Sequence, residues 1–144
     1  MLYSELLKQK RPCPFCSPGE RVFEAKGAAY LTYSVAPYTK FHLLVIPKRH
    51  DASFEKLTAA EWQDIHAMLT VGVEVLRRKG ITDYTIIMRN GSAAGRSVQH
   101  PHVHIVPKHS IGDLDRKGSA RRVMSVKAIA AMSTEVAKLL KKKR

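Results

Sequence analysis

Several residue types and patterns that define common protein classes are scarce in this sequence. The 144 residues include only two cysteines, which would remain reduced in the cytosol. No apolar run approaches the ~20 residues that a membrane-spanning helix needs. The first residues contain an acid and lack a long apolar stretch, which argues against a secretory signal. We therefore expect a cytoplasmic protein with no membrane partner.

Acidic residues are also scarce relative to basic ones. The chain has 12 Asp and Glu against 25 Lys and Arg, a formal net charge of +13. Residues 108–144 hold 11 basic and 3 acidic side chains, so the excess is concentrated in this tail. Such a field favours anionic partners, including nucleotides and nucleic acid. No aromatic side chains are interleaved with these cations, as single-strand binders usually require, so we favour a solvated helix end over a nucleic-acid site.

The periodicity of apolar side chains predicts an α+β fold. Residues 57–79 repeat apolar side chains at helical spacing, between a Thr58-Ala-Ala-Glu61 capping box and Gly80. Short apolar segments bounded by turn residues predict five strands. These strands are expected at residues 21–26, 30–35, 41–47, 84–89 and 101–107. We expect an antiparallel five-stranded sheet with one long helix between its third and fourth strands.

The chain changes character after Pro107. Residues 109–120 are polar and contain glycine, which is typical of a mobile loop. Residues 125–141 place small and apolar side chains on one face, which predicts an amphipathic C-terminal helix. We therefore divide the chain into a catalytic domain, 1–107, and a basic loop and helix, 108–144, packed on the same domain.

Three histidines stand at alternate positions, His100, His102 and His104. In an extended segment alternate side chains share one face. The preceding loop offers backbone N–H groups, a hydroxyl, an amide and a guanidinium, which are suitable groups for binding a phosphate. The candidate substrate-binding residues in it are Asn90, Gly95, Arg96 and Ser97.

Two kinds of chemistry fit this triplet. The three imidazoles could bind a catalytic transition metal, as in a metal-dependent phosphoesterase. Alternatively, one imidazole attacks a phosphorus atom while its neighbours position it. The adjacent anion-binding loop favours phosphorus chemistry. A third class, a non-catalytic nucleotide-binding module, would depend on the basic tail rather than on the histidines.

Cys13 and Cys16 form a Cys-x-x-Cys pair. In a cytosolic protein such a pair is half of a zinc site, a redox pair or a coincidence. A redox pair would be expected at the start of a long helix. Here prolines flank the first cysteine, and Ser17-Pro18-Gly19 follows the second. This composition indicates a knuckle between loops and favours zinc, which would need two further ligands.

In these segments the chain resembles the histidine-triad (HIT) family of nucleotide hydrolases and transferases. The resemblance rests on His100-Pro-His102-Val-His104-Ile-Val and on Gly95-Arg96-Ser97-Val98 before it. A second matching segment is Leu44-Val45-Ile46-Pro47-Lys48-Arg49-His50, and the resemblance covers roughly residues 13–107. It implies the same sheet architecture and a homodimer, which is common in the family.

The resemblance also implies a mechanism and a substrate class. His102 would attack the α-phosphorus of a nucleotide and form a covalent nucleotidyl-histidine, with His100 and His104 as further catalytic residues. Ser97 would contact the phosphate. Arg96 stands where the family commonly has Gln, and its fixed charge predicts a preference for dinucleoside polyphosphates over phosphoramidates. Ser34 stands where a carboxylate commonly holds the ribose.

The resemblance further implies that no cofactor is needed for the chemistry but that a structural zinc is present in some members. Carried over, its ligands would be Cys13, Cys16, His50 and His100, a closed Cys₂His₂ site. This assignment leaves His102 and His104 for chemistry. The competing assignment makes His50 and His100 hydrogen-bond partners that orient the catalytic imidazole.

Overall fold

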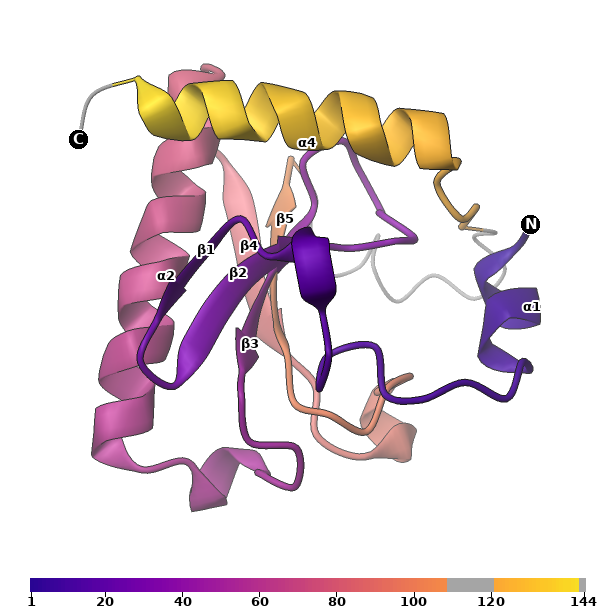
Figure 1. The fold of residues 1–144 in the computed structure, drawn as a ribbon. Coiled ribbons are helices and arrows are strands. Elements are labelled where there is room, and N and C mark those ends of the chain that lie inside the picture. The colour runs from indigo at the N-terminus through magenta and orange to yellow at the C-terminus, as the bar shows by residue number, and fades with distance from the viewer. Residues whose placement is uncertain (109–120, 143–144) are drawn as a thin grey trace.

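The structure, a computed structural model, describes residues 1–108 and 121–142. It contains an antiparallel five-stranded sheet in the order β1-β2-β3-β5-β4 (Figure 1). The strands are β1 (Glu24–Lys26), β2 (Ala29–Tyr33), β3 (Leu43–Pro47), β4 (Tyr84–Met88) and β5 (Val103–Pro107). The described helices are α1 (Tyr3–Leu7), α2 (Ala59–Arg78) and α4 (Val126–Lys141). Short 3-10 turns lie at Gly19–Arg21, Phe54–Lys56 and Ser92–Ala94. The predicted α+β class and the long helix between the third and fourth strands are confirmed.

Helix α2 covers one face of the sheet. It begins at the predicted capping box, in which the Thr58 hydroxyl accepts from the Glu61 N–H and the Glu61 carboxylate accepts from the Thr58 N–H. Its buried side packs on β2, β3 and β5. Gly72 makes the closest approach, because a Cβ atom there would lie 2.5 Å from the Cδ1 atom of Ile105. The absence of a side chain at this position lets the helix lie directly on the sheet.

The opposite face of the sheet carries the chemistry-bearing residues. Side chains alternate along each strand, so Val103 and Ile105 join the core beneath α2 while His104 faces the other way. A second, smaller apolar cluster lies on this other face and consists of Tyr30, Leu44 and Ile46. Because Leu44 of this cluster pairs with His104 across β3 and β5, the cluster lies beside the histidines.

Helix α4 runs across one end of the sheet and packs against α2 (Figure 1). Met132, Val136 and Leu139 on α4 belong to the same core as the sheet. The residues before α4 lie beside the N-terminus, where Leu2 and Arg122 form an isolated β-bridge. The loop predicted at 109–120 lies outside the described residues. Within the described part of the chain, none of the helices combines the length and apolar composition that a membrane crossing requires.

All five predicted strands are longer than the observed ones, and three of them begin at least two residues later than predicted. The first is preceded by the turn at Gly19–Arg21 and pairs only from Glu24. The third begins at Leu43, because Phe41 adopts a φ of 66° that is incompatible with a strand. The fifth begins at Val103, after Pro101, which has no N–H for the ladder. His100 and His102 therefore lie in the segment leading into the strand rather than within it.

Candidate active site and metal centre

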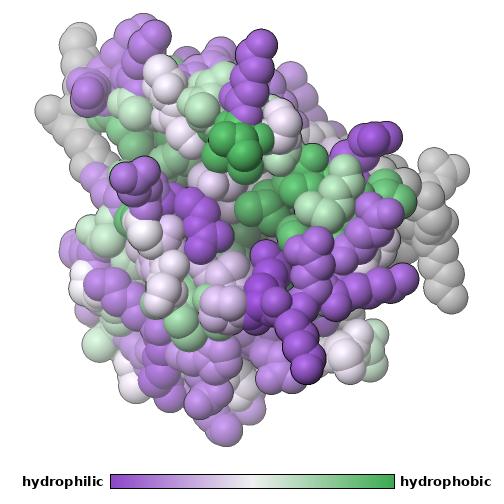
Figure 2. Space-filling view, turned by 45° about the vertical axis from the view of Figure 1, so that its right-hand side comes forward, coloured by the Kyte–Doolittle hydropathy of each residue, from purple (hydrophilic) through white to green (hydrophobic). Residues whose placement is uncertain are grey.

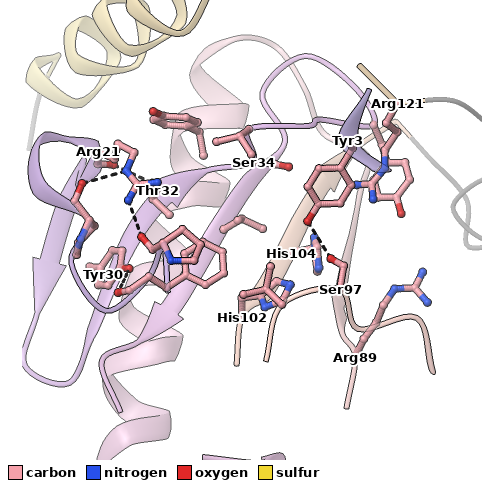
Figure 3. Close-up of a pocket in the computed structure, with 18 of the residues that line it drawn as sticks. Tyr3, Arg21, Tyr30, Thr32, Ser34, Arg89, Ser97, His102, His104 and Arg121 are labelled. Atoms are coloured by element: carbon pink, nitrogen blue, oxygen red, sulfur yellow. Dashed lines mark hydrogen bonds between the residues drawn. The ribbon is translucent and has the colours of Figure 1, made fainter. Parts of the chain in front are cut away.

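A cavity opens on the sheet face opposite α2 (Figure 3). His102 and His104 line it, together with Gly95 and Ser97 from the loop before β5. Other walls come from the N-terminal segment, from β2, β3 and the loop between them, and from the segment before α4. They include Tyr3, Phe15, Tyr30, Ser34, Tyr38, Leu44 and Arg121. In the space-filling view of Figure 2, hydrophobic side chains gather around a hollow in a largely hydrophilic face. The cavity therefore offers apolar, aromatic and cationic groups beside two imidazoles.

The ring of His102 is held in a single tautomer. Its Nδ1 atom lies 2.8 Å from the carbonyl oxygen of His100. A carbonyl only accepts hydrogen bonds, so Nδ1 carries the proton and Nε2 retains its lone pair. The side chain is 5% exposed, and burial lowers its pKa below the usual value for histidine. At neutral pH this ring is thus an uncharged base and nucleophile.

A hydrogen-bonded chain also orients His104. The Tyr38 N–H donates to the Nδ1 atom of His42 over 3.1 Å. The remaining proton of a neutral His42 is therefore on Nε2, which lies 2.9 Å from the Nδ1 atom of His104. His104 consequently carries its own proton on Nε2. Burial, followed by the charges of neighbouring groups, lowers the pKa of His104 well below its ordinary value.

Sequence reasoning missed His42. The residue lies directly before β3 and is only 2% exposed. A polar side chain directly before five buried strand residues was the available signal, because a buried polar group needs a hydrogen-bond partner. The structure brings it against His104, 62 positions away in the chain.

The loop before the histidines is shaped by two glycines. Gly91 and Gly95 have φ values of 84° and 88°, a region that favours glycine. Ser97 lies at the cavity, and its Oγ atom is 2.9 Å from the hydroxyl of Tyr3. Of the four predicted substrate-binding residues, Gly95 and Ser97 line this cavity.

The other two predicted substrate-binding residues are placed differently. The side-chain oxygen of Asn90 accepts from the Phe54 N–H over 3.1 Å. Arg96 donates through Nε to the carbonyl of Val98 and lines a neighbouring cavity with Lys56. Ser97 lies on the boundary between the two cavities. Arg96 thus lines the neighbouring cavity rather than the one that contains His102 and His104.

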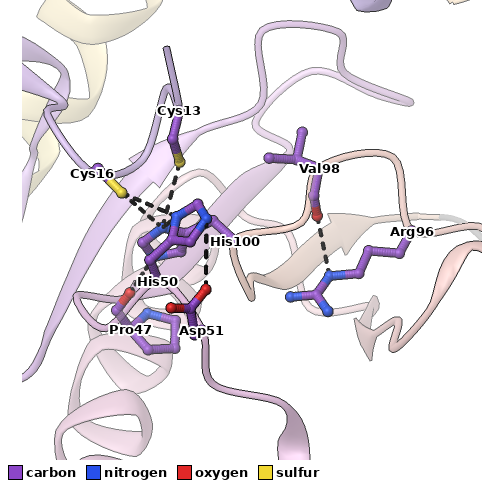
Figure 4. A network of polar contacts seen from close by, with 8 residues as sticks. All are labelled: Cys13, Cys16, Pro47, His50, Asp51, Arg96, Val98 and His100. Carbon is purple, nitrogen blue, oxygen red and sulfur yellow. Dashed lines mark hydrogen bonds and ion pairs between the residues drawn. The ribbon is translucent and has the colours of Figure 1, made fainter.

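Four side chains converge beside the cavity, Cys13, Cys16, His50 and His100 (Figure 4). Their ligand atoms all lie within 4.8 Å of one another. His100 Nδ1 lies 3.5 Å from each sulfur and 3.2 Å from His50 Nδ1. Tetrahedral zinc, with bonds of about 2.0–2.3 Å, separates its ligand atoms by about 3.3–3.8 Å. The four donors therefore fit zinc in both chemistry and spacing.

The tautomer of His100 supports the same fit. Its Nε2 atom lies 2.6 Å from the carbonyl oxygen of Pro47, so Nε2 carries the proton. The Nδ1 lone pair is thereby turned toward the sulfurs and His50, as expected for a metal ligand with an outer hydrogen bond. The ring of His100 does not line the substrate cavity. Its backbone carbonyl contributes to the site by accepting the hydrogen bond from His102 Nδ1.

The three triplet rings do not converge on a single point. His102 and His104 belong to no group of potential metal ligands among the described residues. Their Nδ1 atoms are occupied by the His100 carbonyl and by His42. This arrangement does not favour the alternative in which all three imidazoles bind one catalytic ion.

Comparisons with known proteins agree with this geometry. A family model described as the HIT domain matches residues 17–111. The chain is 32% identical over 108 residues to an adenosine 5′-monophosphoramidase of Schizosaccharomyces pombe, covering 74% of this chain and 73% of the relative. It is 30% identical over 104 residues to a bifunctional bis(5′-adenosyl)-triphosphatase/adenylylsulfatase of Arabidopsis thaliana, covering 72% of this chain and 57% of the relative.

The fold comparison gives the same result. The crystal structure of the NitFhit protein of Caenorhabditis elegans superposes with a TM-score of 0.68 at 25% identity, covering 83% of this chain and 27% of that chain. The residues matched by the family model include the sheet, α2 and the histidine segment. On the strength of the family match and of these relatives, the protein belongs to the HIT family.

Proposed function

We propose that this protein is a nucleotide hydrolase or nucleotidyl transferase that acts at the α-phosphate through a covalent nucleotidyl-His102. The observation that carries the proposal is the hydrogen bond from His102 Nδ1 to the His100 carbonyl. It leaves the Nε2 lone pair available at a cavity that already contains the loop of Gly95 and Ser97. The named activities of the two relatives, a phosphoramidase and a triphosphatase, support the same reaction class.

The first step forms one bond and breaks one. The Nε2 lone pair of His102 attacks the α-phosphorus, and the bond from phosphorus to the leaving group breaks, with its electron pair departing on the leaving group. The His102 ring becomes cationic, and the His100 carbonyl stabilises that charge through Nδ1–H. Ser97 and loop N–H groups donate to the phosphate oxygens.

The second step restores the histidine. Water or another acceptor attacks phosphorus, the nitrogen–phosphorus bond breaks, and the pair returns to His102 Nε2. The acceptor's proton is released to solvent. The Nε2–H of His104 donates a hydrogen bond to the phosphate or the leaving group throughout, since Nδ1 is occupied by His42. No step requires a metal at the phosphorus.

The protonation state of His104 bears on the substrate. Its pKa is lowered well below the ordinary value, first by burial, so at neutral pH it offers a hydrogen bond rather than a full proton. An amine leaving group needs a proton, whereas a nucleoside polyphosphate departs as an anion. Together with Arg96 and Lys56 in the neighbouring cavity, this supports dinucleoside polyphosphates as the preferred substrates over phosphoramidates.

We further propose that the Cys13, Cys16, His50 and His100 group holds a structural zinc. All four potential ligand positions are filled by side chains, which is typical of closed, structural sites. When bound, zinc would supply a crosslink between the N-terminal knuckle, the end of β3 and the histidine segment. It would thereby fix the His100 backbone whose carbonyl orients His102.

We also propose a homodimer formed through the outer edge of β4, which pairs with no other strand among the described residues. This strand is the last in the sheet order, and Tyr84 and Ile86 on it are 40% and 46% exposed. An exposed, partly apolar edge strand is a ready template for pairing with a second copy. Antiparallel pairing of two such edges would join the two sheets.

The covalent step is tested by trapping it. Protein in excess over a nucleotide labelled in its α-phosphate is quenched within milliseconds, under conditions in which a phosphorus–nitrogen bond survives, and peptides are sequenced by mass spectrometry. We expect the label on His102, no label in His102→Ala, and unchanged labelling in His66→Ala, which alters an exposed histidine of α2. Full turnover by His102→Ala would overturn the mechanism and favour a histidine-independent site.

A further inference from the structure

The substrate cavity has a one-sided charge distribution. Its described lining residues include four arginines, Arg11, Arg21, Arg89 and Arg121, and no Asp or Glu. Arg21 has a structural role, because its guanidinium donates to the carbonyls of Pro14 and Pro18 in the cysteine knuckle. Among the described lining residues, the other three arginines carry more positive charge than one esterified phosphate carries negative charge. A ligand with one further anionic group would balance them better.

Arg121 is held in place between two tyrosines. Its guanidinium carbon lies 4.6 Å from the ring centroid of Tyr3 and 4.1 Å from that of Tyr38. It also donates through Nη1 to the carbonyl of Ala36 over 3.1 Å. Its backbone carbonyl accepts from the Tyr3 N–H. Among the described residues, no carboxylate forms an ion pair with it.

This arrangement holds the guanidinium in a defined position before a ligand arrives. The cation–π contacts with the two rings restrict the orientation of the guanidinium. A guanidinium fixed in this way loses less conformational entropy when it binds an anion. The hydroxyl of Tyr3 is 2.9 Å from Ser97 Oγ, so the same tyrosine contacts both the arginine and the loop proposed to hold the reacting phosphate.

A second arginine lies on the other side of the reacting histidines. Arg89 donates through Nη1 to the carbonyl of Ala94 over 2.7 Å, against the loop of Gly95. In Figure 3, His104 and Ser97 lie between Arg121 and Arg89. Both cations act electrostatically on His104. The two arginines thus line the cavity on either side of His104 and Ser97.

We propose that Arg121, with Arg89, forms a second phosphate subsite beside the reacting phosphate, and that Arg121 determines the preference for substrates bearing that second phosphate. The inference rests on the proposed nucleotide chemistry and specifies its substrate. The second phosphate comes either from the leaving group or from the sugar. Ser34, a neutral residue on the cavity wall, presents no charge that would repel a phosphate in either position.

The experiment compares three substrates in the full-length protein. Adenosine 5′-phosphoramidate has one phosphate, diadenosine triphosphate adds phosphates in the leaving group, and the 3′-phosphorylated phosphoramidate adds one on the sugar. The variants are Arg121→Ala, Arg121→Lys and the control Arg122→Ala, which removes the same charge from an exposed neighbour that does not line the cavity.

We expect Arg121→Ala to lower kcat/KM about tenfold or more on a two-phosphate substrate, as for loss of a charge-assisted contact. The loss on the phosphoramidate should be less than about threefold. The substrate that is affected identifies the source of the second phosphate. Arg121→Lys should recover only part of the loss, because lysine lacks the planar fork, and Arg122→Ala should match the wild type.

Two outcomes would overturn the proposal: an equal loss on all three substrates, or no loss on any. Affinities for AMP, ADP and adenosine 3′,5′-bisphosphate, measured by calorimetry, separate this proposal from the covalent mechanism. If the wild type turns over no substrate but Arg121→Ala selectively weakens one bisphosphorylated ligand, the mechanism fails and the subsite stands. Affinities unchanged for all three ligands, together with unchanged kinetics, would reject the subsite while leaving His102 labelling unaffected.

Discussion

The Nε2 atom of His42 lies 2.9 Å from the Nδ1 atom of His104. The Tyr38 N–H fixes the direction of this hydrogen bond at its other end. The chain runs from a backbone amide through two imidazoles to the cavity, and it leaves His104 with a proton on the nitrogen that remains for substrate. In the same way, His102 Nδ1 donates to the His100 carbonyl, so His102 has its lone pair on Nε2. Backbone groups thus set opposite roles for two neighbouring histidines.

Replacing His42 should therefore impair the chemical step. His42→Asn removes the ring that donates to His104, and we expect kcat to fall by about 10–100-fold, as for other outer-shell partners of functional histidines. KM should change little, since His42 does not line the substrate cavity. Steady-state kinetics test this. The matched control is His66→Asn, which changes an exposed histidine of α2. A raised KM with unchanged kcat would contradict the positioning role.

The pH dependence follows from the lowered pKa values of His102 and His104. The nucleophile must be unprotonated, so kcat/KM should fall to half of its maximum only below pH 6.5. The unfolded chain binds protons at these histidines before the folded protein does. The free energy of unfolding should therefore also decrease as pH falls below about 6.5. Half-maximal kcat/KM at or above pH 6.5 would contradict this assignment.

Metal removal should destabilise the fold. Zinc bound only by the folded protein, at a free concentration 1,000-fold above its Kd, adds about 4 kcal/mol to the free energy of unfolding. Chelation should remove this contribution, and Cys16→Ser should largely abolish the chelator effect. Elemental analysis and denaturant unfolding provide the measurements. We expect about one zinc per chain; a protein without stoichiometric metal and insensitive to chelator would show that these residues serve only as hydrogen-bond partners.

The outer edge of β4 gives a test of the proposed dimer. Ile86→Asp places a charge on this edge strand, and we expect it to weaken self-association by about tenfold or more, because an unpaired charge in an interface is costly. Val126→Asp is the control, since Val126 is 85% exposed at the start of α4. Analytical ultracentrifugation measures both. Dissociation by Val126→Asp, with Ile86→Asp still dimeric, would move the interface to α4.

Local patterns in the sequence were enough to predict the long helix and the presence of the five strands. The apolar periodicity and the capping box predicted α2, and the short buried segments predicted the five strands, because each depends on neighbours a few residues apart. Alternation of His100, His102 and His104 was compatible with metal binding or phosphorus chemistry, and the adjacent anion-binding loop favoured phosphorus chemistry. The strand ends were less well predicted. They depend on details such as the positive φ of Phe41, which a periodic pattern does not contain.

Only the tertiary structure determined which chemical role each of these side chains can take. His100 is separated by 53 positions from the Pro47 carbonyl that sets its tautomer, and no spacing rule in the sequence connects them. Likewise, Arg121 reaches Tyr3 and Tyr38 because the segment before α4 lies beside the N-terminus. Hydrogen bonds and cation–π contacts act over a few ångströms in space. Roles that depend on partners distant in the chain therefore emerge only once folding has brought the partners together.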